Sequence, residues 1–449
     1  MASNQDFVLP PVSSFDLQSL PDERSKTLYT LLQRNHQNHA VLSGPKLIFH
    51  NHMPHMLGSA YLLGYPCDKL IEMYQNESSQ LKSLNDGLIR TGITKDNWRQ
   101  LLGKKKYTAA YTAFFDQELA NTPNDWKTLV NEYLFTPPQP LINGFIGGLG
   151  HAFIHLAYAY EFSNPQIATE ALSLGCTDRD PIHHYLDSPY PDTSTYKTTS
   201  AKEILHRVHT DTRFSNLFSV PGFINIATTF AHAEHALLEH WNAWDIVNPA
   251  EQFRDVVDLA GLLLIESRNG EGEYDFFLAH LLTVGHALRV LLPSFPWGYR
   301  VGVLRQFWLF VLYVYVAQLR PGVGDGRNVG GVELRGRDWG WVYERCLEGE
   351  SWGDAHVVKV VRAFRMLEEW KNEKDGWCLR AAVSFWRDFE VGLALGLGWR
   401  ALRLRSDGTS RLIMYHQDVP FILQSTITYL ETEMVSTRYG LLLCVQNVA

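Results

Sequence analysis

The sequence predicts a mainly α-helical protein built as one large multi-helix domain with long loops. Beyond about residue 25, apolar residues recur at helical spacing, whereas the strict alternation typical of half-buried strands is scarce. Loop-forming residues separate the helical segments at Pro137-Pro138, at 187–200 and at 322–331. The segments between these loops do not form independent units. A chain of 449 residues with 45% hydrophobic composition can bury a sizeable core.

Three parts of the chain are expected to differ in structure. Residues 1–25 contain Pro10-Pro11 with several Ser and Asp, and they are expected to form an extended N-terminal arm. Residues 26–430 are expected to form the helical domain. Residues 431–449 are expected to form an atypical C-terminal tail.

Four helices have start and stop signals with a physical explanation. Asn51 is a plausible N-cap, Pro54 is tolerated in a first turn, and Pro66 lies just beyond the expected end of that helix. The segment from Tyr274 is apolar on nearly every face and stops before Pro293, which predicts a core helix. The four helices are expected at 52–64, 147–162, 274–292 and from Ser351 or Asp354 to about Lys371.

Charge, cysteine usage and hydropathy exclude several classes of protein. A formal net charge of −8 gives no basic field for nucleic acid. The five cysteines are scattered without a C-x-x-C pair, which indicates a reducing compartment rather than a disulfide framework or thiolate zinc site. No signal sequence is visible, and the apolar run 307–317 is shorter than the roughly 20 residues that span a bilayer. We therefore expect a soluble, cytoplasmic protein without membrane or nucleic-acid partners, with 307–317 as a buried helix.

The 18 histidines carry the strongest functional signal because several of them share helix faces. His52 and His55 are three residues apart in a first turn, where the positive end of the helix dipole favours neutral rings. His151 and His155 are four apart, and His280 lies inside the apolar helix. A single buried histidine is more often a satisfied core residue than a ligand. Several on separate helices favour a shared metal, because buried polar rings need partners.

His356 and Lys359 are one turn apart on the last of the four expected helices. Lys359 either extends along an apolar flank to reach water or is buried with a lowered pKa. In the second case its neutral amine can react with carbon dioxide, and the resulting carbamate would supply an oxygen ligand. Histidines with such an oxygen ligand suit non-haem Fe(II), and they suit zinc as well.

Several recognisable catalytic motifs are absent from the sequence. No G-x-G-x-x-G follows a strand, so a Rossmann site for flavin or NADP is not visible. The chain also lacks G-x-S-x-G, H-E-x-x-H and the second E-x-x-H of a ferritin-like di-iron centre. His232, His235, Glu239 and His240 form a competing cluster, but its spacing is one residue longer than that of an inverted zincin. We interpret that cluster as a helix surface or the wall of a secondary pocket.

Three segments together resemble the questin oxidase-like family. They are 50–55 (His-Asn-His-Met-Pro-His), 150–156 (Gly-His-Ala-Phe-Ile-His-Leu) and 275–283 (Asp-Phe-Phe-Leu-Ala-His-Leu-Leu-Thr). Their order and spacing match the family, and the resemblance covers roughly residues 30–370. It implies fungal secondary metabolism, with Baeyer–Villiger-type oxidative ring opening of an anthraquinone or related aromatic polyketide, and a link to NADPH.

The residue patterns and the resemblance lead to one set of candidate site residues. We expect catalytic roles for His52 and His151, metal ligation by His55, His155, His280, His356 and Lys359, and a substrate pocket that includes Tyr158 and Phe277. The sequence leaves open which of the histidines are direct ligands and which orient them.

The function expected from this set is that of an oxidoreductase acting on an aromatic polyketide with O2 and non-haem Fe(II). Either NADPH or the hydroquinone form of the substrate would serve as reductant. Two alternatives stay open. One is a zinc hydrolase with a metal-bound water as nucleophile. The other is a non-catalytic helical binding protein whose histidines satisfy one another.

Overall fold

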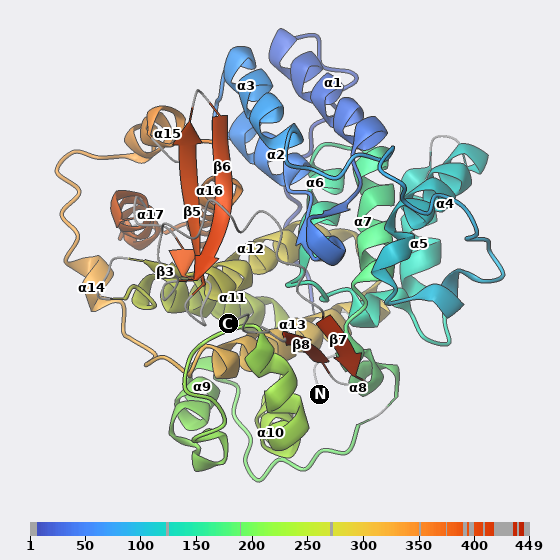
Figure 1. The fold of residues 1–449 in the computed structure, drawn as a ribbon. Helices are drawn as coiled ribbons and strands as arrows, with labels where there is room; N and C mark the ends of the chain where they lie inside the picture. Colours follow the sequence, from blue (N-terminus) through green and yellow to red (C-terminus); the bar gives the residue numbers. More distant parts are fainter. Residues whose placement is uncertain are drawn as a thin grey trace, which may run out of the picture.

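Helices make up most of the protein, and the predicted mainly α-helical fold class is confirmed (Figure 1). The computed structural model describes residues 7–388, apart from 123–124, 189, 270–272, 350–351 and 374, and the strands that follow residue 388. The α-helices are α1 (Glu23–Asn38), α2 (Met53–Leu62), α3 (Cys67–Ser78), α4 (Thr108–Asn121), α5 (Trp126–Phe135), α6 (His151–Glu161), α7 (Pro165–Thr177), α8 (His184–Asp187), α9 (Ala201–Thr210), α10 (Ile224–Asn242), α11 (Pro249–Glu266), α12 (Phe276–Leu291), α13 (Trp297–Ala317), α14 (Arg327–Gly330), α15 (Trp339–Glu348), α16 (Ala355–Lys371) and α17 (Trp377–Asp388).

Short strands and 3-10 turns complete the fold. The strands are β1 (Leu42–Ser43), β2 (Phe49–His50), β3 (Tyr274–Asp275), β4 (Leu393–Ala394), β5 (Trp399–Ser406), β6 (Thr409–His416), β7 (Met434–Thr437) and β8 (Gly440–Leu443). The 3-10 helices are η2 (Pro45–Leu47), η3 (Trp98–Leu101), η4 (Lys105–Tyr107), η5 (Leu141–Gly144), η6 (Pro181–His183), η7 (Thr212–Phe214) and η8 (Leu292–Ser294).

The longest strand pairing is the antiparallel β5–β6 hairpin, which runs from Trp399 opposite His416 to Ser406 opposite Thr409. The sequence analysis missed this hairpin, although the Asp-Gly pair between two alternating runs is a hairpin signal. The strands β7 and β8 fall within the predicted tail, and the other residues of 431–449 lie outside the described residues.

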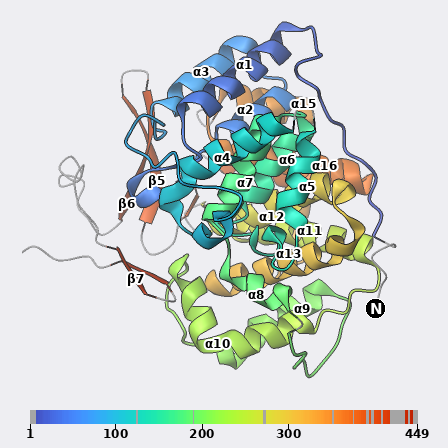
Figure 2. The ribbon, with the colours of Figure 1, turned by 90° about the vertical axis from the view of Figure 1, so that its right-hand side faces the viewer.

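The apolar core is continuous, and α12 lies at its centre, in contact with α6, α11, α13 and α16. Every residue of α6 is buried, as is nearly every residue of α12, which confirms the predicted core helix. An apolar residue at almost every position suits a helix that other helices surround on all sides. Residues 7–22 contain no helix or strand, and Figure 2 shows this arm running along one side of the helical body. The arm is anchored because Phe7 and Leu17 are buried.

Two helical stretches, Phe276–Ser294 and Trp297–Ala317, are long and apolar enough to cross a membrane by length and composition. In each, 83% of the most apolar window is buried inside the protein. The sequence-based argument that the run 307–317 is too short was wrong, because the helix that contains it has 21 residues. Its interpretation as a buried helix is confirmed.

The first turns of the site-bearing helices differ slightly from the predictions. Helix α6 begins at His151 rather than at 147, because Gly148, Leu149 and Gly150 have φ values of 59°, 59° and 76° and cannot continue a right-handed helix. Helix α2 begins at Met53 after the cap residue His52, while the Asn51 side chain accepts a hydrogen bond from the Met53 amide at 3.0 Å.

The capping of the other two site helices follows the expected pattern. Asp275 accepts from the amides of Phe277 and Leu278 at the start of α12. Asp354 accepts from the amides of His356 and Val357 at the start of α16, which decides between the two predicted caps, Ser351 and Asp354.

Helices α2 and α6 approach each other closely at Gly58. A Cβ atom at Gly58 would lie 2.7 Å from ring carbons of both Tyr158 and Phe162. The missing side chain therefore lets the two helices touch, and their histidines face each other across this contact (α2 with α6).

The glycine before α6 generates a prediction about stability. Gly150→Ala should lower the free energy of unfolding by about 1–3 kcal/mol, because φ is positive there and the new Cβ would lie 2.3 Å from Val284 on α12. Gly302→Ala in α13 is the matched control. It meets no atom within 4 Å and should raise the free energy of unfolding by about 0.5–1 kcal/mol. Denaturant unfolding followed by circular dichroism measures both, and equal effects would contradict the assigned contact.

Candidate functional site

Four histidines from four helices surround one point inside the protein. His52 caps α2, His151 opens α6, His280 lies in the second turn of α12, and His356 lies in the first turn of α16. The ring centroids form a closed circuit with successive separations of 5.0, 5.0, 5.4 and 5.1 Å. We call these residues the four-histidine cluster. The first and the last of them, His52 and His356, are 304 residues apart along the chain (356 − 52), so only the fold brings the four together.

Backbone carbonyls fix the protonation of two of these rings. Nδ1 of His151 lies 2.5 Å from the carbonyl oxygen of Gly148, and Nδ1 of His280 lies 2.8 Å from that of Phe276. A carbonyl only accepts hydrogen bonds, so each Nδ1 carries the proton and each Nε2 keeps a lone pair. This is the arrangement in which histidines hold metals, because the carbonyl fixes the tautomer and orients the ring. Nε2 of His280 is buried and has no hydrogen-bond partner among the described residues.

The environment keeps three rings of the cluster neutral. Burial, together with the nearby charges of Lys359 and the other rings, lowers the pKa of His52, His151 and His280 well below 6.5. The side chains of His151 and His280 are almost fully buried, whereas His52 and His356 retain partial exposure. The cluster is therefore closed toward α6 and α12 and more open toward the start of α2 and α16.

Lys359 lies one turn after His356 on α16 and is only 2% exposed. Its Nζ atom is buried with no hydrogen-bond partner among the described residues. Burial lowers the pKa of Lys359 to about 7. The structure thus agrees with the buried alternative rather than with a lysine that extends to solvent. A large part of the population is a neutral amine at neutral pH, and such an amine is nucleophilic.

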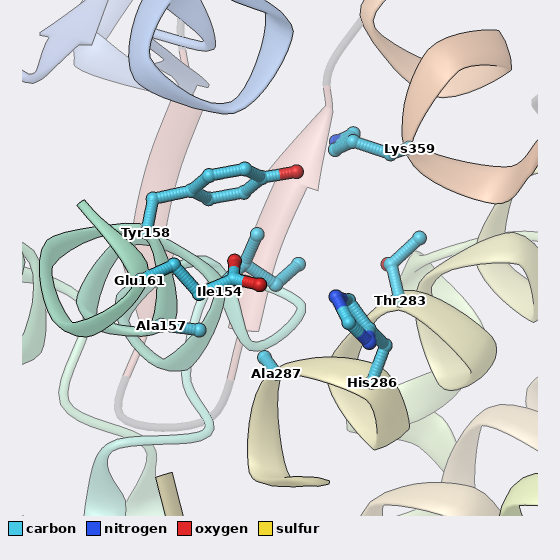
Figure 3. Close-up of a pocket in the computed structure, with 8 residues that line it drawn as sticks. All are labelled: Ile154, Ala157, Tyr158, Glu161, Thr283, His286, Ala287 and Lys359. Carbon is cyan, nitrogen blue, oxygen red and sulfur yellow. The ribbon is translucent and has the colours of Figure 1, made fainter. Parts of the chain in front are cut away.

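A small pocket adjoins Lys359, and Figure 3 shows Tyr158, Thr283 and His286 reaching into it from α6 and α12. It has room for about one water molecule. The expected substrate-pocket residue Tyr158 is 3% exposed, and its hydroxyl is hydrogen-bonded to Ser59 at 2.5 Å. The pocket beside Tyr158 has no space for a flat aromatic ring system in this conformation.

A row of aromatic rings leads from the protein surface to the cluster. Phe223 is 51% exposed and stacks on Phe277 with a centroid distance of 6.3 Å. Phe277 contacts Phe276 at 5.4 Å, and the Phe276 ring lies 4.6 Å from that of His280 and 4.8 Å from that of His356. Phe277, which was expected to line the substrate pocket, therefore lies between the exposed ring of Phe223 and the partly exposed ring of Phe276, which borders the cluster.

Two predicted metal ligands lie outside the circuit of four rings. Both nitrogens of His155 are occupied, with Nδ1 2.9 Å from Nε2 of His55 and Nε2 2.7 Å from Oε2 of Glu170. This arrangement leaves His155 no nitrogen for a metal. His55 lies beside the cluster, with its ring centroid 5.7 Å from that of His52 and 6.0 Å from that of His151. The predicted catalytic pair, His52 and His151, instead belongs to the circuit itself, with Nε2 atoms 2.8 Å apart.

Sequence reasoning missed other residues that border the cluster. The His50 ring stacks on that of His151 at 3.8 Å and 3°, and its Nε2 lies 2.9 Å from Asp178. Arg362 and Glu161 form a buried ion pair next to the pocket. His50 could have been found because it belongs to the same motif as His52. The two carboxylates give no signal, because their partners lie far away in the sequence.

The competing histidine cluster of α10 does not form a second site. His232 and His235 are exposed. Glu239 pairs with Arg213, and His240 is hydrogen-bonded to Asp211 at 2.9 Å. The interpretation of this segment as a helix surface with local hydrogen bonds agrees with the structure.

The donor set suits a metal ion, although no three His, Cys, Asp or Glu side chains of the described residues already have metal-ligand geometry. His52 and His151 instead share a direct contact between their Nε2 atoms, 2.8 Å apart. Two nitrogens that bind one ion at about 2.1 Å lie roughly 3 Å apart, so this pair is already near the separation that an ion requires. His280, His356 and Lys359 are the other groups of this chain that can complete such a site.

Comparisons with known proteins identify the family of this chain. The model of the questin oxidase-like family matches residues 49–364, a range that includes all four rings of the cluster and Lys359. A Baeyer–Villiger oxidase of Pestalotiopsis microspora is 24% identical over 378 residues, which cover 78% of this chain and 82% of the relative. A questin oxidase of Aspergillus fumigatus is 24% identical over 382 residues, with coverages of 78% and 82%. A Baeyer–Villiger monooxygenase of Aspergillus aculeatus is 24% identical over 404 residues, with 80% of each chain covered.

The family match extends over more than half of the chain, and the relatives are named for oxidation reactions. Both findings support an oxidoreductase. Each of the three motifs that carry the resemblance contributes one histidine to the four-histidine cluster. These residues are His52, His151 and His280. The chain belongs to the questin oxidase-like family.

Proposed function

We propose that this protein catalyses a Baeyer–Villiger-type oxidative ring opening of an anthraquinone or related aromatic polyketide at a non-haem iron site. The observation that carries the proposal is the closed circuit of four imidazoles with an unpaired lysine beside it. In this proposal the iron is held by His52, His151, His280, His356 and a carbamate formed on Lys359. Relatives named for Baeyer–Villiger oxidation support the reaction type, and their fungal sources support a role in secondary metabolism.

When bound, the iron would supply the redox chemistry that dioxygen needs to react beside the substrate. The protein's own groups do the rest. Backbone carbonyls hold the Nδ1 protons of His151 and His280, so their Nε2 lone pairs stay available at neutral pH. The neutral amine of Lys359 can take up carbon dioxide, which gives the site an anionic oxygen ligand.

The aromatic row gives a flat substrate an approach to the cluster. Phe276 borders His280 and His356, and Phe277 connects it to the exposed Phe223. Offset stacking against such rings would orient a planar polyketide with its ketone toward the cluster. One oxygen atom enters between the ketone carbon and its neighbour to give a lactone, and the second is reduced to water by two electrons and two protons. These electrons come from NADPH or from the hydroquinone form of the substrate. Addition of water across the ester bond of the lactone then opens the ring.

Metal analysis tests this assignment directly. Protein purified anaerobically without an affinity metal should contain stoichiometric iron by elemental mass spectrometry and should consume O2 with anthraquinone substrates. His280→Asn should lose both the metal and the O2 uptake, because it removes one of the lone pairs fixed toward the cluster. His235→Asn, on the exposed face of α10, is the matched control and should retain both.

Other outcomes of this measurement would point elsewhere. Stoichiometric zinc without O2 uptake would favour a zinc hydrolase that uses the same histidines. Protein without metal, and with a stability indifferent to chelators, would return the histidines to a structural role. Metal retained in His280→Asn at full activity would contradict the ligand set.

Lys359 generates a separate prediction about stability. In metal-free protein and buffer depleted of carbon dioxide, Lys359→Met should raise the free energy of unfolding by about 1–3 kcal/mol at pH 7, because it replaces an unpaired buried amine. The folded protein has a pKa of about 7 at this lysine, below the unfolded value, so unfolding takes up a proton between pH 7 and about 10. The wild type therefore gains stability as pH rises through this window, and the advantage of the variant should shrink.

The control for this prediction lies on the same helix. Lys371 is paired with Asp258 at 2.8 Å and with Glu373 at 3.4 Å, so Lys371→Met should lower the free energy of unfolding by up to about 1 kcal/mol. Denaturant titrations at several pH values measure both variants. A Lys359→Met variant less stable than the wild type at pH 7 would show that the amine has a partner in the folded protein.

A further inference from the structure

A second set of buried polar side chains runs from the four-histidine cluster to the protein surface. His55 on α2 is hydrogen-bonded to His155 on α6, with 2.9 Å between Nε2 and Nδ1. His155 continues to Glu170 on α7, with 2.7 Å between Nε2 and Oε2. Oε1 of Glu170 lies 2.8 Å from Nδ1 of His36 on α1, and Nε2 of His36 lies 3.0 Å from Asp116 on α4. We call these five residues the Glu170 chain.

The outer half of the Glu170 chain is charged. Burial alone would raise the pKa of Glu170, but hydrogen bonds with His155 and His36 bring it down to about 2. Burial likewise opposes a charge on His36, yet hydrogen bonds to Asp116 and Glu170 raise its pKa to about 10. At neutral pH, Glu170 is therefore a carboxylate and His36 an imidazolium with a proton on each nitrogen. Asp116, at the outer end, has a 37% exposed side chain.

The charge on Glu170 determines where the protons lie in the inner half. A carboxylate only accepts hydrogen bonds, so Nε2 of His155 carries a proton. A neutral His155 that donates from Nε2 to Glu170 has its lone pair on Nδ1. That lone pair accepts the hydrogen bond from Nε2 of His55. Burial lowers the pKa of His55 well below 6.5, so this ring is neutral and its own lone pair is on Nδ1.

The lone pair on Nδ1 of His55 lies inside the protein, next to the four-histidine cluster. Nδ1 of His55 is buried and has no hydrogen-bond partner among the described residues. The ring lies between those of His151 and Tyr158, at centroid distances of 6.0 and 5.3 Å. A buried nitrogen without a partner is costly, and a chain that only satisfied the core would not leave one beside the cluster.

We propose that Glu170 is a positioning residue that acts through His155 to hold His55 in one tautomer. In this tautomer Nε2 of His55 carries the proton, and Nδ1 presents a lone pair beside the four-histidine cluster. His55 is then a fifth imidazole acceptor for the ion or for a molecule bound to it. This role rests on the proposed metal site, while the tautomer itself is a property of the metal-free protein.

The tautomer can be measured without metal or substrate. Protein labelled with ¹⁵N-histidine gives separate NMR signals for protonated and unprotonated ring nitrogens, and the His55 signals are those that disappear in His55→Asn. We expect a protonated Nε2 and an unprotonated Nδ1 in the wild type at pH 7. A proton on Nδ1 would overturn the proposal. This result needs no change at Glu170, so it stands even if Glu170 variants fold poorly.

Replacement of Glu170 tests its control over His55. Glu170→Met keeps the length of the side chain and removes the acceptor, so His55 should show a mixture of both tautomers. Affinity for added Fe(II) under anaerobic conditions should fall by about 10- to 100-fold, as for other groups that orient metal-binding histidines. An unchanged tautomer or an unchanged affinity would overturn the positioning role.

Glu118→Met is the matched control for lost stability. Glu118 is a buried carboxylate on α4 that pairs with Lys95 at 2.7 Å and Tyr133 at 2.8 Å and touches neither the chain nor the cluster. Its replacement should leave the His55 tautomer and the Fe(II) affinity unchanged. A wild type that binds no Fe(II) but shows the expected His55 tautomer would contradict the proposed function while leaving the hydrogen-bond assignment intact.

Discussion

The site depends on one physical constraint, which is that imidazole lone pairs stay unprotonated inside an apolar core. Water would protonate or hydrogen-bond such nitrogens, and each one left without a partner costs about 1–3 kcal/mol. The fold tolerates them because α12 is surrounded by α6, α11, α13 and α16, which exclude solvent from His151 and His280. The carbonyls of Gly148 and Phe276 then determine which nitrogen of each ring remains free.

Glycines in the backbone set the spacing of the rings. At Gly58, α2 touches Tyr158 and Phe162 of α6, which brings His52 and His55 opposite His151 and His155. At Gly150, the start of α6 touches Val284 of α12, one turn beyond His280. A side chain at either glycine would separate two helices that carry histidines. Close backbone approach therefore fixes the cluster before any ligand contributes to it.

The sequence was sufficient for the helices and for the histidines that meet in the cluster, but not for the geometry of the site. The apolar pattern of α12 and the cap Asp354 identify two of the site helices, and the spacing of His52 and His55 shows that they share a face. Spacing cannot show which ring nitrogen is already occupied. The spacing of His151 and His155 predicts that His155 is a metal ligand. It cannot reveal that Glu170 already occupies Nε2 of His155, because Glu170 lies on another helix and no local pattern connects the two. The predicted start of α6 at residue 147 was wrong because the left-handed conformation of residues 148–150 cannot be read from the apolar pattern of the sequence.

The distribution of buried charge explains why a modified lysine suits this site. Three buried carboxylates lie near the histidines, and each is paired with a cation: Glu161 with Arg362, Asp178 with Lys105, and Glu170 with His36, which also pairs with Asp116. Their charge is thus already balanced by the protein. The circuit itself holds no carboxylate, so a divalent ion there would bring two uncompensated positive charges into a desolvated space. A carbamate on Lys359 would place a negative charge beside the rings, which is a role that another histidine at this position could not fill in the proposed iron site.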